Sequence, residues 1–180
     1  MRSSNTHVLS SEFLYSPTEL GRHCHCSVLL AAANGDLFVT WYSYPEDEYV
    51  DAVIVLTRKL QGESDWEDAR PCFPRSSYSA GNSVLFETSS GRIGMFYVRL
   101  TGNYWTDSVV HLTFSDDRGE TWDSSEQVWP EPGMMVRHPP ITMSDGSLLL
   151  PTTNDCTILF YYVPDRLIRI GSRYSDSRIP

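Results

Sequence analysis

Short apolar runs alternate with glycine-containing turns along the chain, and the turns return at a nearly constant spacing. They read Asn-Gly-Asp at 34–36, Ser-Gly-Arg at 90–92 and Asp-Gly-Ser at 145–147, so their glycines stand 56 and 55 residues apart. Each turn lies between two apolar runs, and tight hairpin turns need the positive φ that Asn-Gly and Asp-Gly tolerate. The pattern therefore predicts three β-hairpins that belong to one repeating unit.

A second marker follows the same period. Leu-Thr at 56–57 recurs at 112–113, and Trp66 recurs at Trp122, both after 56 residues. Repeated units of four antiparallel strands are typical of β-propeller blades, and no stretch shows a helical apolar period. We therefore expect an all-β protein, a β-propeller of four-stranded antiparallel blades. The predicted third strands of the units lie at 52–58, 109–114 and 167–170.

A period of this length divides the 180 residues into about three units. Closed propellers carry about 4 to 8 blades, so three blades do not close a ring. We expect the N-terminal half of a larger domain, and half a propeller produced alone would expose apolar blade faces and self-associate. The predicted parts are a lead-in strand over 1–22, then blades over about 23–80, 81–135 and 136–180, the last one incomplete.

One turn carries a longer motif. Residues 115–122 read SDDRGETW and fit Ser-x-Asp-x-Gly-x-Thr-Trp at every fixed position. The motif predicts that Asp117 accepts hydrogen bonds from turn amides, that Gly119 has a positive φ and that Trp122 packs beneath the hairpin. A calcium loop is the competing interpretation, but Arg118 stands before the glycine, where an oxygen ligand is needed. An incomplete copy that keeps only the tryptophan of the motif lies at 62–66, and a third copy begins at 175–178.

This motif is the Asp-box, and with it the chain resembles the sialidase-like BNR repeat family. Four further stretches resemble that family in the same order, namely 25–37, 41–54, 81–86 and 136–151. The resemblance implies a six-bladed propeller, of which this chain holds about three blades. It also implies a glycoside hydrolase of the exo-α-sialidase type, which removes a terminal acidic sugar from a glycan. In the family the Asp-box is structural and lies away from the active centre.

Charge narrows the range of partners. The formal net charge is −9, and the 14 basic residues comprise 13 arginines and the single Lys59. A chain without a basic surface is not expected to bind nucleic acid or an anionic membrane. No apolar run reaches the roughly 18–20 residues of a membrane span, and the N-terminus lacks a signal-peptide core, so we expect a cytoplasmic protein. The four scattered cysteines indicate reduced thiols rather than a disulfide framework.

The repeat itself predicts a site. The innermost strands of propeller blades begin near the central axis. Counting back nine or ten positions from each hairpin glycine reaches His25 and Cys26 in the first unit, Asn82 in the second and Arg137 in the third. The repeat thereby places His25, Asn82 and Arg137 at equivalent positions. We expect these side chains to meet around one axis and Arg137 to bind a substrate carboxylate through its guanidinium fork. The alternatives stay open: a core histidine, a turn residue and a partner for a structural carboxylate.

An acidic loop at 43–51 opens towards the same face. Glu46 and Asp51 match family positions and are the acid/base candidates, because crowded like charges raise a carboxyl pKa. A solvated acidic loop is the alternative. In the second blade Trp105 is placed to stack on a sugar ring, or simply to pack. His25 is a further catalytic candidate, since a histidine near the axis suits proton abstraction.

The family implies three arginines for the substrate carboxylate and a tyrosine nucleophile. Arg22 is the candidate for the first arginine, and the tyrosine and remaining arginines would come from later blades. The run 23–26 reads His-Cys-His-Cys, but alternate residues of a strand point apart, so we expect no metal site and no cofactor. The rival functions are a non-catalytic carbohydrate-binding propeller, a polysaccharide lyase on the same fold, and an inactive truncated product.

Overall fold

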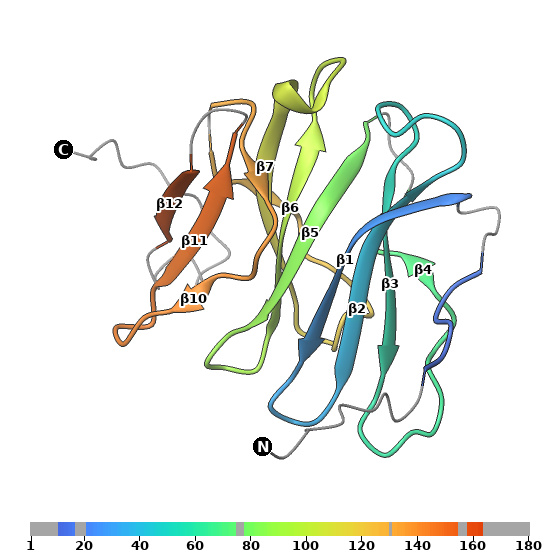
Figure 1. Cartoon of the computed structure of the whole chain (residues 1–180). Helices are drawn as coiled ribbons and strands as arrows, with labels where there is room; N and C mark the ends of the chain where they lie inside the picture. Colours follow the sequence, from blue (N-terminus) through green and yellow to red (C-terminus); the bar gives the residue numbers. More distant parts are fainter. Residues whose placement is uncertain (1–10, 17–20, 75–77, 130, 155–157, 164–180) are drawn as a thin grey trace, which may run out of the picture.

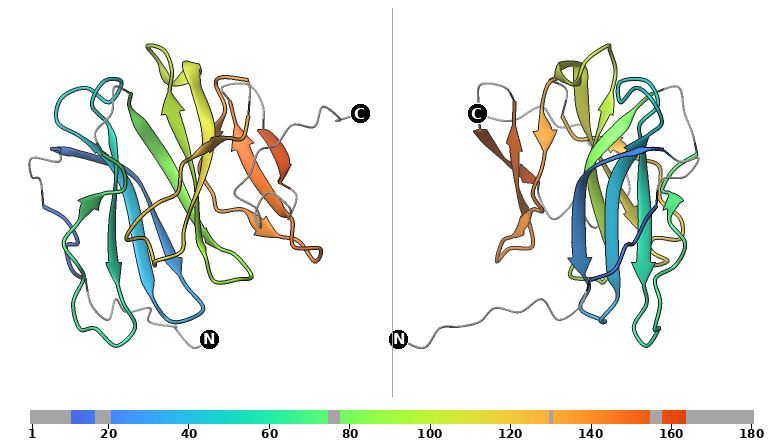
Figure 2. Two further views of the ribbon diagram at one scale, coloured as in Figure 1. Left: turned by 180° about the vertical axis from the view of Figure 1, so that it is seen from behind. Right: turned by 45° about the vertical axis from the view of Figure 1, so that its right-hand side comes forward.

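The computed structural model describes residues 11–16, 21–74, 78–129, 131–154 and 158–163. Three antiparallel sheets stand side by side as blades, and the same order is seen from behind (Figures 1 and 2). The all-β fold of antiparallel blades predicted from the sequence is confirmed. Blade 1 contains β1 (His23–Ala31), β2 (Leu37–Tyr44), β3 (Val53–Lys59) and β4 (Arg70–Pro71). Blade 2 contains β5 (Ala80–Glu87), β6 (Ile93–Leu100), β7 (Ser108–Ser115) and β8 (Glu126–Gln127), with the short 3₁₀ helix η1 (Trp105–Asp107) between β6 and β7.

Blade 3 has the same plan with an interrupted first strand. Both β9 (Met135–Val136) and β10 (Ile141–Thr142) pair with β11 (Leu148–Thr153), and β11 pairs with β12 (Ile158–Val163). The third strand of this blade is therefore β12, whereas the predicted strand at 167–170 lies outside the described residues, as does the motif at 175–178. The constant period fails here, because the third strand begins 12 residues after Gly146 in blade 3 (158 − 146) but 17 residues after Gly91 in blade 2 (108 − 91).

The three hairpin turns are equivalent, as predicted. Gly35, Gly91 and Gly146 have φ values of +91°, +82° and +85°. In each turn the glycine N–H donates to the carbonyl of the residue three positions earlier, at 2.9, 3.0 and 3.0 Å. A side chain with a Cβ is strained at such a φ, so these positions require glycine. These turns determine where the second strand of each blade begins, and their even spacing is the spacing of the repeat.

Strand alternation separates the apolar side chains into layers between the blades. One face of blade 1 packs on blade 2 through residues such as Phe38, Leu56 and Met95, and the other face of blade 2 packs on blade 3. The outer face of blade 1 is covered by Leu14 and Tyr15 of the lead-in segment. Blades packed face to face in this way orient their first strands towards a common hub. Within the described residues, no helix is long and apolar enough to cross a bilayer.

The Asp-box turn forms as its sequence predicts. The Asp117 carboxylate accepts hydrogen bonds from the Thr121 amide at 2.8 Å and from the Ser115 hydroxyl at 2.8 Å. Gly119 has a φ of +80°, and its N–H donates to the Ser115 hydroxyl at 2.7 Å. Trp122 packs against the apolar layer between blades 1 and 2. The turn is therefore a structural element held by its own side chains.

Candidate functional site

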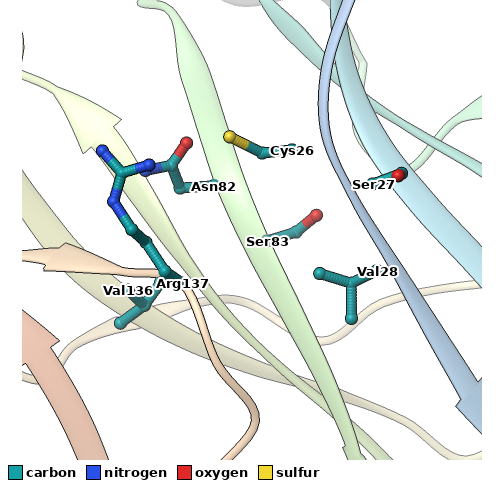
Figure 3. A pocket seen from close by; sticks show the side chains of 7 residues that line it. All are labelled: Cys26, Ser27, Val28, Asn82, Ser83, Val136 and Arg137. Atoms are coloured by element: carbon teal, nitrogen blue, oxygen red, sulfur yellow. The ribbon is translucent and has the colours of Figure 1, made fainter.

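A small cavity opens where the first strands of the three blades meet. Its volume is about 140 Å³. Figure 3 shows the side chains around it, contributed by β1, β5, β9 and the segment that interrupts the first strand of blade 3. The residues that line it are Cys26, Ser27, Val28, Asn82, Ser83, Val136 and Arg137.

Each of these strands departs from regular pairing at the same place. The register shifts between His25 and Val28 in β1 and between Gly81 and Val84 in β5. In blade 3 the residues 137–140 separate β9 from β10. Such bulges turn side chains out of the regular alternation of a strand and are frequent beside binding sites. The three irregularities are therefore what directs polar side chains into the hub.

Asn82 is a buried polar residue of the cavity, with 4% of its surface exposed. Its backbone has a φ of +46°, a left-handed conformation that asparagine adopts more readily than most residues. The amide nitrogen Nδ2 is buried and has no hydrogen-bond partner among the described residues. A buried donor left unpaired costs about 1–3 kcal/mol, so it favours a ligand that brings an acceptor.

Arg137 is exposed and lies in the break between β9 and β10. No carboxylate pairs with it in the part of the chain that the structure describes. Figure 3 shows its guanidinium and the Asn82 amide directed towards the same end of the cavity. Two donor groups, one of them charged, thus face an opening that has no acidic residue among its described lining residues.

Cys26 completes the ring of equivalent positions with a φ of +53°. Its side chain is solvent-accessible. Protein atoms packed around the thiol raise its pKa by desolvation, which outweighs the lowering effect of the Arg137 charge, and Glu48 raises it further. A thiol with a raised pKa stays protonated at neutral pH, so Cys26 forms a neutral part of the wall rather than a thiolate nucleophile.

His25 lies beside the cavity instead of lining it. Its ring stacks on Tyr42 with centroids 5.5 Å apart, and its Nε2 lies 3.2 Å from the Tyr44 hydroxyl. In all three blades the cavity residue stands nine positions before the hairpin glycine, which in blade 1 is Cys26. The sequence count allowed His25 or Cys26, and the bulge after His25 decides between them.

The acidic loop presents a different carboxylate from those chosen by sequence. Glu48 accepts a hydrogen bond from the Tyr42 hydroxyl at 3.1 Å, and burial together with the Glu48 charge raises the Tyr42 pKa. Glu46 is exposed, and Asp51 is half-buried, with its backbone N–H donating to the Asp47 carbonyl at 3.0 Å. Neither Glu46 nor Asp51 lines the cavity. Nothing in the sequence distinguishes Glu48 from its acidic neighbours, because its contact depends on how the loop folds back.

Trp105 lies between blades 1 and 2. Its ring contacts Tyr42, with centroids 5.9 Å apart, and Tyr49 at 6.1 Å. A Cβ on Gly81 would lie 3.1 Å from the Tyr42 ring and 3.2 Å from that of Trp105, so glycine lets the three segments approach. Arg22 is exposed, and its backbone N–H donates to the Tyr44 carbonyl at 3.0 Å. The rings of Tyr42, Tyr49 and Trp105, here called the aromatic rim, form a cluster beside Gly81, the chain neighbour of Asn82. Neither these rings nor the Arg22 side chain are among the groups that line the cavity.

Cation ligands do not gather anywhere in the described ranges, which contain no group of three or more His, Cys, Asp or Glu side chains placed to hold a metal ion. The run 23–26 does not converge: Cys24 Sγ lies 3.8 Å from the Ser43 hydroxyl, and the His23 ring stacks on Tyr44.

Comparison with protein families settles the family. Residues 35–173 match the model described as BNR repeat-like domain. The chain belongs to this family. Among curated protein sequences, none matches it significantly.

Solved structures share the fold of this BNR repeat-like chain. The NanB sialidase of Streptococcus pneumoniae matches with a TM-score of 0.70 and 9% identity, over 85% of this chain and 44% of that one. The intramolecular trans-sialidase of Ruminococcus gnavus, solved with oseltamivir carboxylate, matches with a TM-score of 0.63 and 12% identity, over 79% and 58%. Trypanosoma rangeli sialidase matches with a TM-score of 0.59 and 10% identity, over 78% and 30%.

The BNR repeat-like chain therefore spans about a third to three fifths of the length of these sialidases. At such low identity the likeness shows the fold, that of a sialidase-like propeller, and leaves the chemistry to the residues of the site.

Proposed function

We propose that this chain supplies part of the hub pocket of a sialidase-like glycoside hydrolase, which binds the terminal acidic sugar of a glycan and cleaves its glycosidic bond. The observation that carries the proposal is the pairing, at one cavity, of an Arg137 guanidinium and a buried, unpaired Asn82 amide, with no carboxylate partner for Arg137 among the described residues. Both groups donate hydrogen bonds, and a carboxylate is the acceptor that a guanidinium binds with two parallel bonds.

The size of the cavity sets what it holds. A volume of about 140 Å³ accommodates a carboxylate and its nearest atoms rather than a whole sugar ring. The rest of the sugar would lie against the aromatic rim, where Trp105 offers a ring face. Among the structures of similar fold, that of the Ruminococcus gnavus trans-sialidase is a complex with oseltamivir carboxylate. This supports an acidic sugar over a neutral one.

The catalytic assignments stay predictions. Glu46 and Asp51 are the proposed acid/base residues, and Glu48 joins them because it is the loop carboxylate that acts on both Tyr42 and Cys26. His25 would act as a base in the lyase alternative. The three carboxylate assignments require that the acidic loop reach the scissile bond once a sugar is bound.

Binding is tested by titrating the protein calorimetrically with N-acetylneuraminic acid and with its methyl ester, which lacks the charge. We expect the free acid to bind and the ester to bind weakly. Because hydrogen bonds to charged groups contribute about 1.5–3 kcal/mol, Arg137→Ala should weaken the affinity roughly tenfold to a hundredfold. The matched control is Arg92→Gln, at the far end of the blade 2 strands. Equal binding of acid and ester, or full affinity in a folded Arg137→Ala variant, would refute the proposal.

A non-catalytic glycan-binding propeller is the second candidate. The observation that favours it is that Glu46 and Asp51 lie outside the cavity wall. A fluorogenic aryl α-sialoside separates the two functions: release of the aryl alcohol, reduced in Glu46→Gln or Asp51→Asn, supports the hydrolase. Binding of the acid without any release supports the binding protein.

A further inference from the structure

A second and larger cavity lies in blade 2, away from the hub. Its volume is about 380 Å³, within the range of small-molecule sites. Its wall comes from the ends of β6 and β7, from β8 and from the segment before β5, whereas the hub residue Asn82 lies on β5. The residues that matter here are Tyr78, Arg99, Thr101, Val109, His111 and Gln127.

Arg99 provides the charge of this cavity. Its guanidinium carbon lies 3.4 Å above the centre of the Tyr78 ring. Stacking of this kind occupies the flat face of the guanidinium and leaves its N–H donors, which point outwards in the plane, available for a planar partner. Across the described residues no carboxylate pairs with Arg99, although the chain as a whole is acidic. The cavity therefore holds a positive charge that the described part of the protein does not neutralise.

His111 provides a second donor beside Arg99. It is 6% exposed, and its Nδ1 lies 3.3 Å from the Ser125 hydroxyl. The Tyr97 hydroxyl donates to the same Ser125 oxygen at 2.9 Å. Because Ser125 accepts from Tyr97, its own hydrogen is free to be donated to His111 Nδ1, and we assign the His111 tautomer on that basis. The imidazole then carries its hydrogen on Nε2, the nitrogen left over for another partner.

The protonation state agrees with that arrangement. Burial, with a further contribution from the Arg99 charge, lowers the pKa of His111 to about 4. The imidazole is neutral at pH 7 and donates through one nitrogen only. The hydrogen-bonding groups of Thr101 and Gln127 are turned elsewhere: the Thr101 hydroxyl donates to the Asp107 carbonyl, and the Gln127 amide nitrogen to the Trp129 carbonyl at 2.6 Å. No carboxylate lies among the described residues of the wall.

We propose that this cavity binds the oxyanion group of a small ligand, a carboxylate or a phosphate, which Arg99 holds through its guanidinium edge while His111 donates a further hydrogen bond. The site is separate from the hub pocket and does not depend on the function proposed for it. Carboxylate and phosphate share the required chemistry, namely negatively charged oxygens that accept several bonds at once.

The test is nuclear magnetic resonance of the full chain, with the Arg99 Nε–H and His111 imidazole signals followed during titration with sodium acetate, sodium phosphate or sodium chloride. We expect saturable shifts in the millimolar range with acetate or phosphate and none beyond general screening with chloride. The anion that binds more tightly identifies the ligand group. Arg99→Gln should weaken binding roughly tenfold to a hundredfold, because the charged hydrogen bonds are lost. Arg99→Lys keeps the positive charge but lacks the planar guanidinium fork, so its affinity should lie between those of the wild type and Arg99→Gln.

Arg92→Gln is the matched control, since it removes an arginine that lines neither cavity and should leave these shifts unchanged. The proposal is overturned if acetate and phosphate act no differently from chloride, or if folded Arg99→Gln keeps the wild-type affinity. If Arg99→Gln does not fold, the pKa of His111 in the wild-type protein, measured with and without the anions, still tests the proposal. A bound anion stabilises the imidazolium and raises the pKa of His111, whereas an unchanged pKa at saturating acetate and phosphate would contradict the proposal.

Discussion

The contact between Asp36 and Arg118 allows a sharp test of how the blades are held together. Asp36 follows the first hairpin glycine and has no exposed surface, and Arg118 belongs to the Asp-box turn of blade 2. Asp36 accepts from Arg118 Nε at 2.5 Å and from the Gln61 N–H at 2.7 Å. Burial raises the Asp36 pKa, but hydrogen bonds from Arg118, Gln61 and Asn34 lower it by more. The pair, here called the inter-blade latch, fastens one repeat to the next.

The magnitude follows from the burial of the two partners. Breaking a fully buried pair costs about 3–5 kcal/mol, whereas an exposed pair contributes about 0.2–1 kcal/mol. Asp36 is fully buried, but the Arg118 side chain is 47% exposed, so solvent screens part of the interaction. We expect Asp36→Asn to lower the free energy of unfolding by about 2–3 kcal/mol. In a chain of this size that corresponds to a fall in Tm of about 4–12 °C.

A double-mutant cycle measures the latch itself. Asp36→Asn keeps an acceptor for Gln61, and Arg118→Gln keeps a long polar side chain at a position whose φ is +62°. Stability is measured by denaturant unfolding of the two single variants and the double variant. We expect a coupling energy of at least about 1 kcal/mol. The control is Asp116→Asn, whose partner is Arg92 and whose side chain is 69% exposed, and it should cost under about 1 kcal/mol. A latch coupling below about 0.5 kcal/mol would refute the reasoning.

Two further predictions concern the Asp-box and the rim. Burial raises the pKa of Asp117, but hydrogen bonds from Thr121 and Ser115 lower it by more, to about 2 from an ordinary value of 3.8. The unfolded chain takes up this proton first, so the stabilisation is present above about pH 4 and lost as pH falls towards 2. Denaturant unfolding across this range should show a smaller loss in Asp117→Asn; equal losses would contradict it. Gly81→Ala places a methyl group 3.1 Å from the Tyr42 ring and should lower stability by about 1–3 kcal/mol in the same assay. An unchanged denaturant midpoint would contradict this prediction, because it would mean that the Tyr42 and Trp105 rings move aside at no energetic cost.

The sequence by itself determined the elements that a few consecutive residues encode. The hairpin turns need glycine at Gly35, Gly91 and Gly146, and the Asp-box closes through Asp117 and Gly119, so these features follow from local backbone geometry. The alternation of apolar residues then specifies strands that pack face to face. Fold class and the approximate region of the hub therefore follow from the order of the amino acids alone.

Tertiary structure alone decided which side chains reach the hub and how the blades meet. A bulge after His25 places Cys26 in the cavity, and a loop that folds back on Tyr42 selects Glu48 among similar acids. The bond from Arg118 to Asp36 joins residues far apart in the chain. Strand alternation predicts direction only while pairing is regular, and a one-residue irregularity reverses it. The contacts that define a site depend on distant segments, and no local pattern encodes them.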